Sequence, residues 1–162
     1  MDKNASLKSS KLKVAVLMGS SSDEAIMKSC VDGLNYFGIP HEVHVMSAHR
    51  SPETVDRFAV EAEKNGFGVI IAGAGMAAHL AGVVASRTVL PVIGVPLEGS
   101  ALGGQDALYS IVQMPSGIPV ATVAIGKAGA RNAAVLAAEI LALWDNEIRQ
   151  KLLIFRQKGS KL

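Results

Sequence analysis

The sequence predicts a three-layer α/β/α sandwich around a five-stranded parallel sheet. Five short, largely apolar runs alternate with helical patterns along the chain, at residues 14–18, 42–46, 69–72, 92–95 and 120–125. Nearly unbroken apolar runs are typical of parallel strands that are buried on both faces. The length of 162 residues fits one domain, and no internal repeat or linker divides it. These three observations favour a flavodoxin-like sheet with the strand order 2-1-3-4-5.

The helices are predicted from apolar residues at helical spacing and from residues that favour helix ends. The first helix begins near Ser22 and ends at Gly38. The second has Ser51 as its N-cap and Pro52 at its first position, where the missing N–H does no harm. A short helix of small residues follows His79. The remaining helices are expected at residues 105–112, 130–144 and 146–157.

The basic residues lie mainly at the two ends of the chain. The formal net charge is +2, but nine of the sixteen Lys and Arg residues lie in residues 1–13 and 147–162. Residues 14–146 carry seven basic and twelve acidic side chains. An acidic body lacks the basic face that binds nucleic acid, so no nucleic-acid partner is expected. We expect residues 1–13 to form a flexible basic tail and residues 14–162 to form a single α/β domain.

Cysteine content and hydropathy favour a cytoplasmic protein. Cys30 is the only cysteine, so no intrachain disulfide can form, and its place among apolar positions predicts a buried thiol. Residues 67–86 lack Lys, Arg, Asp and Glu, but four glycines and His79 within them argue against a membrane span. The polar start of the chain does not resemble a signal peptide.

Unusual residues follow each predicted strand, at the edge where open parallel sheets bind ligands. Five such segments hold eight of the sixteen glycines, at residues 19–23, 47–50, 73–79, 98–106 and 126–131. The connections at the opposite edge are short and ordinary. We therefore expect one ligand site at the carboxyl edge of the sheet.

The first of these segments, Gly-Ser-Ser-Ser-Asp, has two interpretations. It leads from a strand into a helix, where unpaired backbone N–H groups can hold a phosphate. Alternatively, Ser21 and Glu24 form a capping box that explains the polar residues without a ligand. Asp23 would repel a phosphate, so it is better suited to accept hydrogen bonds from sugar hydroxyls. Ser20, nearby N–H groups and Arg50 would then hold the phosphate of a mononucleotide.

His49 is the best candidate for acid–base chemistry, because an imidazole gains and loses a proton near neutral pH. Arg50 beside it can bind a phosphate or carboxylate through two donors. A histidine next to a helix is often structural, but the position at the ligand edge favours a catalytic role. His41 and His44 are interpreted as structural. No further ligand lies at a useful spacing from His44 and His49, so no metal site is expected.

Residues 73–78, Gly-Ala-Gly-Met-Ala-Ala, offer a competing interpretation. They fit the pattern GxGxxA between a strand and a helix, and Glu98 ends the next strand as a dinucleotide fingerprint requires. That fingerprint belongs on the first strand, however, and too little sheet follows to complete a nicotinamide site. Glycines for close packing of a helix on the sheet are the structural alternative. An oxidoreductase is therefore the weaker hypothesis.

Six motifs lie in order between residues 14 and 144 with no evident gap: MGSSSD at 18–23, SAHR at 47–50, IAGAG at 71–75, AAHL at 77–80, SIVQMP at 110–115 and AIGKAG at 124–129. Together they closely resemble the 5-(carboxyamino)imidazole ribonucleotide mutase family, the bacterial-type PurE enzymes of purine synthesis. The resemblance implies an isomerisation to 4-carboxy-5-aminoimidazole ribonucleotide, without cofactor or metal. In this reaction a carboxylate leaves the exocyclic nitrogen as CO2, which stays in the site and adds to ring carbon 4.

The resemblance also implies roles for individual residues. His49 would be the catalytic proton shuttle, which protonates the departing amine and later removes the ring proton. Glycines after the third strand would confine the CO2. The expected substrate-binding residues, with His79 as a secondary contact, are Ser20, Ser22, Asp23, Ser47, Arg50, Gly73, Ala74, Gly75 and His79.

The family is octameric, with sites assembled from neighbouring subunits, so a homo-octamer is expected. The predicted helix at residues 130–144 is apolar on nearly every face, as a helix buried by its own sheet and by a partner would be. A helix buried within one core would look similar.

Two residues depart from the family pattern. Met76 stands where a third glycine is usual, and Ala81 stands where proline is usual. Met76 is expected to narrow the pocket or shift the loop without changing the reaction. The Ala-Gly-Ala-Gly and Ala-Ala-His patterns favour the mutase over the related class that carboxylates aminoimidazole ribonucleotide directly with CO2. A non-catalytic nucleotide-binding module is the alternative from another class.

Overall fold

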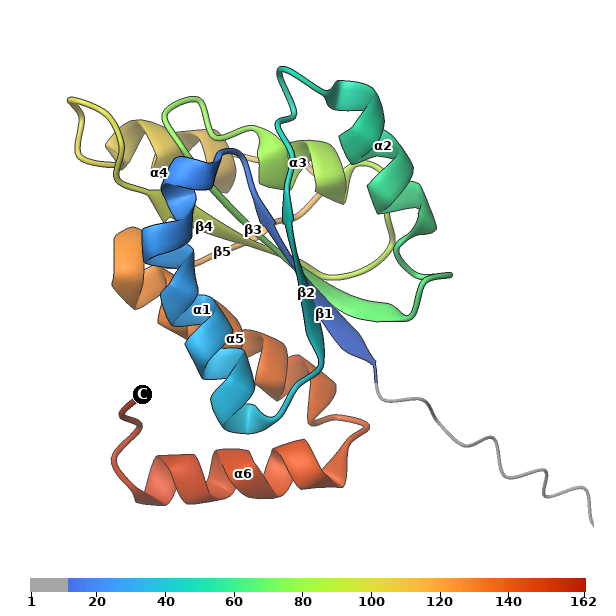
Figure 1. The fold of residues 1–162 in the computed structure, drawn as a ribbon, viewed down its shortest axis with the longest axis vertical. Coiled ribbons are helices and arrows are strands. Elements are labelled where there is room, and N and C mark those ends of the chain that lie inside the picture. Colours follow the sequence, from blue (N-terminus) through green and yellow to red (C-terminus); the bar gives the residue numbers. More distant parts are fainter. Residues whose placement is uncertain (1–11) are drawn as a thin grey trace, which may run out of the picture.

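The computed structural model describes residues 12–162, which form a parallel five-stranded sheet with helices on both faces (Figure 1). The strand order is β2-β1-β3-β4-β5, so the predicted sandwich and its strand order are confirmed. Every neighbouring pair is parallel. The strands are β1 (Lys13–Met18), β2 (His41–Val45), β3 (Phe67–Gly75), β4 (Val92–Leu97) and β5 (Ala121–Thr122).

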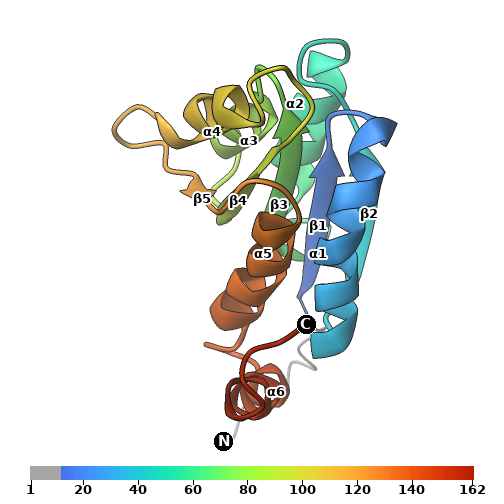
Figure 2. The same ribbon diagram turned by 90° about the vertical axis from the view of Figure 1, so that its left-hand side faces the viewer.

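Helices cover the sheet in two layers, as Figures 1 and 2 show. On one face lie α1 (Glu24–Phe37), which follows the short 3-10 turn η1 (Ser21–Asp23), and α5 (Gly126–Leu141). The other face is covered by α2 (Pro52–Glu61), α3 (Leu80–Ala85) and α4 (Gln105–Val112). The last helix, α6 (Asn146–Gln157), belongs to the layer of α1 and α5.

Alternating side chains of β1 explain why its sequence is apolar without a break. Val14, Val16 and Met18 pack into the core under α1 and α5. Ala15 and Leu17 pack into the core under α2, α3 and α4. Because successive strand residues point to opposite faces, a strand covered on both sides needs apolar residues at every position.

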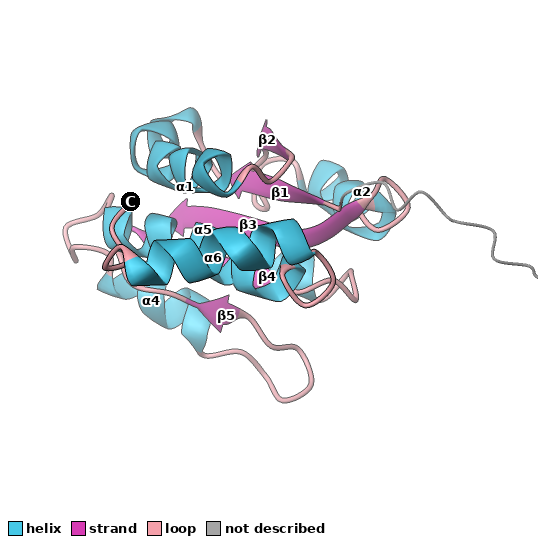
Figure 3. Cartoon of the chain, turned by 90° about the horizontal axis from the view of Figure 1, so that it is seen from below, coloured by secondary structure: helices cyan, strands magenta, loops and turns pink. Residues whose placement is uncertain are grey.

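Helix α6 lies against the carboxyl-terminal ends of α1 and α5 (Figure 3). Lys151 donates a hydrogen bond of 2.8 Å to the carbonyl of Phe37, the last residue of α1. The rings of Phe37 and Phe155 meet edge to face, 5.4 Å apart. An unpaired carbonyl at the end of α1 is thereby satisfied, and α6 is fixed to the domain.

Cys30 is buried in α1, as the sequence predicts. Its apolar surroundings raise the pKa of the thiol to about 12, because a thiolate there would lose its hydration. A thiol that stays protonated at neutral pH is a poor nucleophile, so Cys30 has a packing role.

The boundaries of several elements differ from the prediction, among them those of β4, β5 and α5. β4 continues through Pro96 to Leu97, two residues beyond the predicted run at 92–95. β5 is limited to two residues, and it pairs with β4 only at Ile93 and Gly94. Beyond those residues β4 is an edge on this side, where a proline is tolerated. Helix α5 begins at Gly126, four residues before the predicted start.

The other expectations concern the start of the chain and residues 67–86. The predicted tail, residues 1–13, lies outside the described residues except for its last two, and Lys13 is already the first residue of β1. Residues 67–86 contain β3 and α3 rather than one continuous helix. In the described part of the chain, no helix has both the length and the apolar character to cross a membrane.

Candidate active site

A cavity of about 410 Å³ lies among the loops at the carboxyl ends of β1, β2 and β3. These loops are at the top of Figure 1. All of the residues predicted for the site line this cavity, with the exception of Gly73. The lining consists of Gly19, Ser20, Ser22, Asp23, Ser47, Ala48, His49, Arg50, Ala74, Gly75, Met76, Ala77, His79, Leu80 and Gly99.

Gly73 has a packing role in place of the expected lining role. A Cβ atom at this position would lie 2.5 Å from the sulfur of Met27 in α1. Gly73 therefore allows α1 to approach β3 closely. This agrees with the alternative interpretation of the segment, in which glycines serve the packing of a helix on the sheet. The predicted loop also begins later than expected, because β3 continues through Gly75.

The turn between β1 and α1 contains a capping box one residue earlier than predicted. The Ser20 backbone N–H donates to Asp23 Oδ2 at 3.0 Å, and the Ser22 N–H donates to Ser20 Oγ at 3.3 Å. The box is therefore formed by Ser20 and Asp23, and the prediction of Ser21 and Glu24 is wrong. The reason is the 3-10 turn at Ser21–Asp23, which places the chain reversal before the first residue of α1.

The surroundings of Asp23 in this capping box disfavour the ionised form of its carboxyl. Partial burial raises the pKa of its carboxyl above 3.8, although hydrogen bonds from the Ser20 and Gly19 backbone lower it in part. An acidic group whose pKa is higher in the folded state than in the unfolded state lowers the stability of the protein with rising pH. The loss occurs between the unfolded-state pKa and the folded-state pKa. At neutral pH the carboxylate therefore disfavours folding, so a functional reason for its charge is expected.

The β2–α2 turn presents the next two lining side chains. The Ser47 N–H donates to Ser51 Oγ at 3.3 Å, and the Arg50 N–H donates to Ser47 Oγ at 3.2 Å. Pro52 begins α2 after Ser51, as predicted, but the Ser51 hydroxyl bonds to Ser47 rather than to the helix. This serine-tied turn leaves the side chains of His49 and Arg50 exposed at the cavity.

His49 and His79 are directly hydrogen bonded across the cavity. His49 Nε2 lies 2.8 Å from His79 Nδ1, and the two ring planes are perpendicular. A neutral imidazole has one donor and one acceptor nitrogen, so one ring donates and the other accepts. The pair can take up one proton and keep this bond, but two added protons would leave no acceptor. The arrangement is suited to moving a single proton.

The lining differs in polarity between its two sides. The loops after β1 and β2 contribute polar groups, with one carboxylate and one guanidinium: Ser20, Ser22, Asp23, Ser47 and Arg50. The segment from the end of β3 to the start of α3 contributes mainly apolar surface: Ala74, Met76, Ala77 and Leu80. The histidine pair joins the two sides, because His49 comes from the first group of loops and His79 from the second.

The remaining histidines lie away from the cavity. His41 Nδ1 is 2.9 Å from the carbonyl of Ile39, and the ring of His44 packs 4.9 Å from that of Phe58. Both contacts are of a structural kind, as expected for these residues. Within residues 12–162, no group of three or more His, Cys, Asp and Glu side chains is placed to hold a metal ion.

Some lining residues were not singled out from the sequence. Ala48 and Leu80 carry no polar group, so nothing in their chemistry marks them. Gly99 lies in the fourth segment of the carboxyl edge, residues 98–106, and this position is the feature of the sequence that could have identified it as a lining residue. The fifth segment contributes no lining residue, because Gly129 packs against the Ala124 backbone and Gly126 against Glu98.

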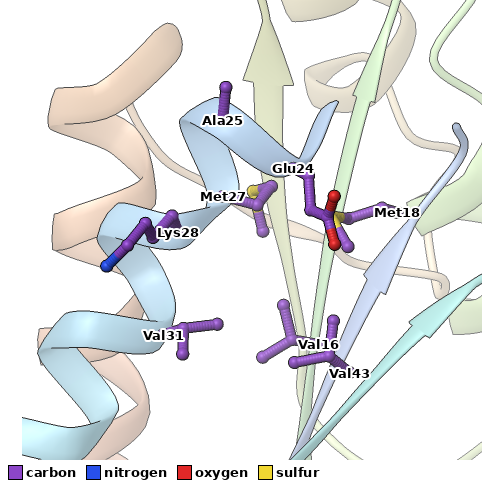
Figure 4. A pocket seen from close by; sticks show the side chains of 8 residues that line it. All are labelled: Val16, Met18, Glu24, Ala25, Met27, Lys28, Val31 and Val43. Carbon is purple, nitrogen blue, oxygen red and sulfur yellow. The ribbon is translucent and has the colours of Figure 1, made fainter. Parts of the chain in front are cut away.

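A larger cavity, of about 520 Å³, lies between α1 and the β2 edge of the sheet (Figure 4). Figure 4 shows Met27 and Val31 of α1 facing Val16 and Val43 of the strands. Its lining is mostly apolar, with Glu24 and Lys28 as the charged members, and it contains none of the residues predicted for the site.

Comparisons with known proteins agree on one family. Residues 13–161 match the family model described as AIR carboxylase. The chain is 57% identical over 140 residues to the N5-carboxyaminoimidazole ribonucleotide mutase of Escherichia coli, covering 86% of this chain and 83% of that protein. It is 56% identical over 147 residues to the mutase of Pyrococcus horikoshii, covering 91% and 82%.

A solved structure shows the same likeness. The crystal structure of Treponema denticola PurE is similar with a TM-score of 0.82 and 33% identity, covering 91% of this chain and 90% of that one. The family model spans nearly the whole chain, and the relatives exceed half identity over most of their length. The chain therefore belongs to the AIR carboxylase family.

Proposed function

We propose that this protein catalyses the N5-carboxyaminoimidazole ribonucleotide mutase reaction of purine biosynthesis. The observation that supports the proposal is the His49–His79 hydrogen bond, which joins two imidazoles between the polar side and the apolar side of the cavity. The names of relatives at 52–57% identity support the same reaction. A nicotinamide-dependent oxidoreductase finds no support, because Gly73 and Gly75 belong to the end of the third strand, β3, and Gly73 packs against α1.

The isomerisation needs one proton delivered and one proton removed. His49 donates a proton to the exocyclic nitrogen as its bond to the carboxylate carbon breaks, which gives an amine and CO2. Ring carbon 4 then attacks the CO2 carbon, and a new carbon–carbon bond forms. His49 removes the proton from carbon 4, which restores the aromatic ring. The sum is an isomerisation without net proton change, so a single titratable group suffices.

The polar side of the cavity would bind the ribose phosphate. The guanidinium of Arg50 and the hydroxyls of Ser20 and Ser47 donate to phosphate oxygens, and the Ser22 hydroxyl lies beside them. Asp23 would accept hydrogen bonds from the ribose hydroxyls, which a carboxylate does better than a neutral group. Ala74, Gly75 and His79 would form the wall beside the imidazole ring.

Asp23→Asn separates this binding role from folding. An amide oxygen can still accept the Ser20 N–H, and the buried charge is removed, so the melting temperature at pH 7 is expected to stay equal or rise. Nucleotide binding is expected to weaken by roughly 10- to 100-fold, the value of one or two hydrogen bonds to a charged group. Calorimetric titration with the product nucleotide and a thermal scan measure the two effects.

Asp32→Asn is the matched control for Asp23→Asn. Asp32 is an exposed carboxylate of α1 that pairs with Lys28, away from the cavity. Its replacement is expected to change neither nucleotide affinity nor melting temperature measurably. Unchanged nucleotide affinity in Asp23→Asn would contradict the ribose-binding role.

The second candidate function is direct carboxylation of aminoimidazole ribonucleotide, which the description of the matching family model favours. The two reactions are separated by a comparison of substrates. Turnover of the carboxyamino nucleotide alone should exceed that of aminoimidazole ribonucleotide with bicarbonate. The reverse order of rates would support the carboxylase.

The protein is further expected to act in the cytoplasm as a homo-oligomer, an octamer by family resemblance. Val43 and Val45 are paired in register with Val16 and Met18, so they face the same side as α1. They are nevertheless 44% and 54% exposed, because α1 does not cover β2. These side chains and the cavity in Figure 4 form an apolar strip that a second copy of the chain would cover.

Val43→Glu tests this surface. A carboxylate in an apolar interface would lose its hydration without a partner, so the oligomer is expected to dissociate into smaller species. Light scattering after size exclusion measures the mass, against 16.9 kDa for one chain. Val60→Glu is the control, since Val60 is 56% exposed on α2, on the other face of the sheet. Equal masses for the wild type and Val43→Glu would contradict an interface on this strip.

A further inference from the structure

Met76 has a backbone conformation that methionine rarely adopts. Its φ angle is +57°, and Ser160 near the carboxyl terminus is the only other non-glycine residue with positive φ among residues 12–162. The conformation allows a tight reversal after β3, in which the Ala78 N–H donates to the Met76 carbonyl at 2.9 Å. This reversal leads the chain into His79, which meets His49.

Glycine would make the same reversal without steric cost. A Cβ atom in the left-handed region costs roughly 1–2 kcal/mol, so a methionine here opposes folding unless its side chain contributes something. That side chain does not pack into the core, because Met76 is 60% exposed. Strain at a residue that lines the candidate active site points to a functional use of the side chain.

The position of Met76 identifies the group that it would contact. It is the largest and most flexible side chain on the apolar side of the cavity, beside Ala77 and Leu80. The nucleotide presents charged and polar groups, which fit the opposite side. CO2 is small, neutral and without hydrogen-bond donors, so the apolar side suits it, and the histidine pair stands between the two.

We propose that Met76 retains CO2 at the apolar side of the cavity between its release and its addition to ring carbon 4. This inference rests on the proposed mutase reaction. Cleavage of the nitrogen–carbon bond gives the amine and CO2, which then has two fates. It either forms the carbon–carbon bond in the site or escapes to solvent, leaving aminoimidazole ribonucleotide. A flexible apolar side chain that lines the cavity favours the first fate by excluding water and slowing escape.

The test compares Met76→Gly and Met76→Leu with the wild type. Each protein receives the unlabelled carboxyamino nucleotide in 13C-bicarbonate with carbonic anhydrase, so that escaped CO2 is replaced by label. The initial rates of labelled product and of free aminoimidazole ribonucleotide are measured by NMR. In Met76→Gly, the rates of labelled product and of free aminoimidazole ribonucleotide, each divided by the rate of unlabelled product, are expected to rise by about tenfold. This is the effect of removing a few methylene groups from an apolar contact. Met76→Leu is expected to stay within about twofold of the wild type, since it keeps the apolar bulk.

Two further readouts distinguish retention from a structural role. Met76→Gly is expected to melt at the same or a higher temperature, because the strain is relieved, and to keep the oligomer mass. Unchanged label incorporation in Met76→Gly would overturn the proposal, as would equal increases in Met76→Gly and Met76→Leu. A wild-type protein that forms no product from the carboxyamino nucleotide would contradict the mutase function itself and remove this inference with it.

Discussion

His49→Asn is expected to lower kcat by about a thousandfold, within the range that general acid–base catalysis contributes. Asparagine retains a polar side chain of similar size but neither delivers nor removes a proton at neutral pH. The dissociation constant of the product nucleotide is expected to change by less than about threefold, because the proposed phosphate and ribose contacts are made by Arg50 and Asp23 and not by His49. Steady-state turnover and calorimetric titration measure the two quantities.

His41→Asn is the matched control for His49→Asn. The His41 ring contacts the Ile39 carbonyl and lies away from the cavity, so its replacement should leave turnover unchanged. A His49→Asn variant with wild-type turnover would exclude His49 as the proton shuttle. Equal losses of turnover and nucleotide affinity would instead indicate a binding role.

Gly129→Ala is expected to have the largest effect on stability. A Cβ atom at this position would lie 1.6 Å from the carbonyl oxygen of Ala124 and 2.6 Å from its carbonyl carbon. Backbone atoms cannot rotate away as a flexible side chain can, so the start of α5 must shift away from the segment that precedes it. The expected loss is about 3 kcal/mol, the upper part of the range for overpacked cores. A chain of this size should then melt roughly 10 °C lower.

Gly99→Ala controls for the general effect of adding a methyl group to a glycine. Nothing lies within 4 Å of a Cβ atom at Gly99, and its φ is not positive. Its melting temperature is expected to stay within about 2 °C of the wild type. A Gly129→Ala variant as stable as Gly99→Ala would show that the start of α5 is not packed as described.

The fold was predictable because the features that identify its strands and helix starts lie in short segments of the sequence. Apolar runs such as Val14 to Met18 identify strands that are covered on both faces, and Ser51 with Pro52 marks a helix start. The exact ends were less predictable, because they depend on neighbouring strands. Pro96 stays in β4 since β5 pairs with β4 only up to Gly94, and no local signal in the sequence gives that length.

The location of the site at the carboxyl edge of the sheet was predictable, but the contacts between its side chains were not. His49 and His79 are 30 positions apart, and only the parallel order of β1, β2 and β3 brings their loops together. Gly73 and Gly75 look alike in the sequence, yet Gly73 lies under α1 beside Met27, whereas Gly75 at the end of β3 lines the cavity. Likewise, the capping box begins at Ser20 because a 3-10 turn precedes α1.

The most direct test of the account is incubation of the wild-type protein with 5-(carboxyamino)imidazole ribonucleotide, without ATP. Proton NMR follows the ring proton on carbon 4, which disappears when the carboxylate moves there. The proposed mutase function predicts that the protein converts most of the substrate to 4-carboxy-5-aminoimidazole ribonucleotide, faster than the substrate loses CO2 in buffer. Formation of aminoimidazole ribonucleotide alone, at the rate seen in buffer, would contradict it.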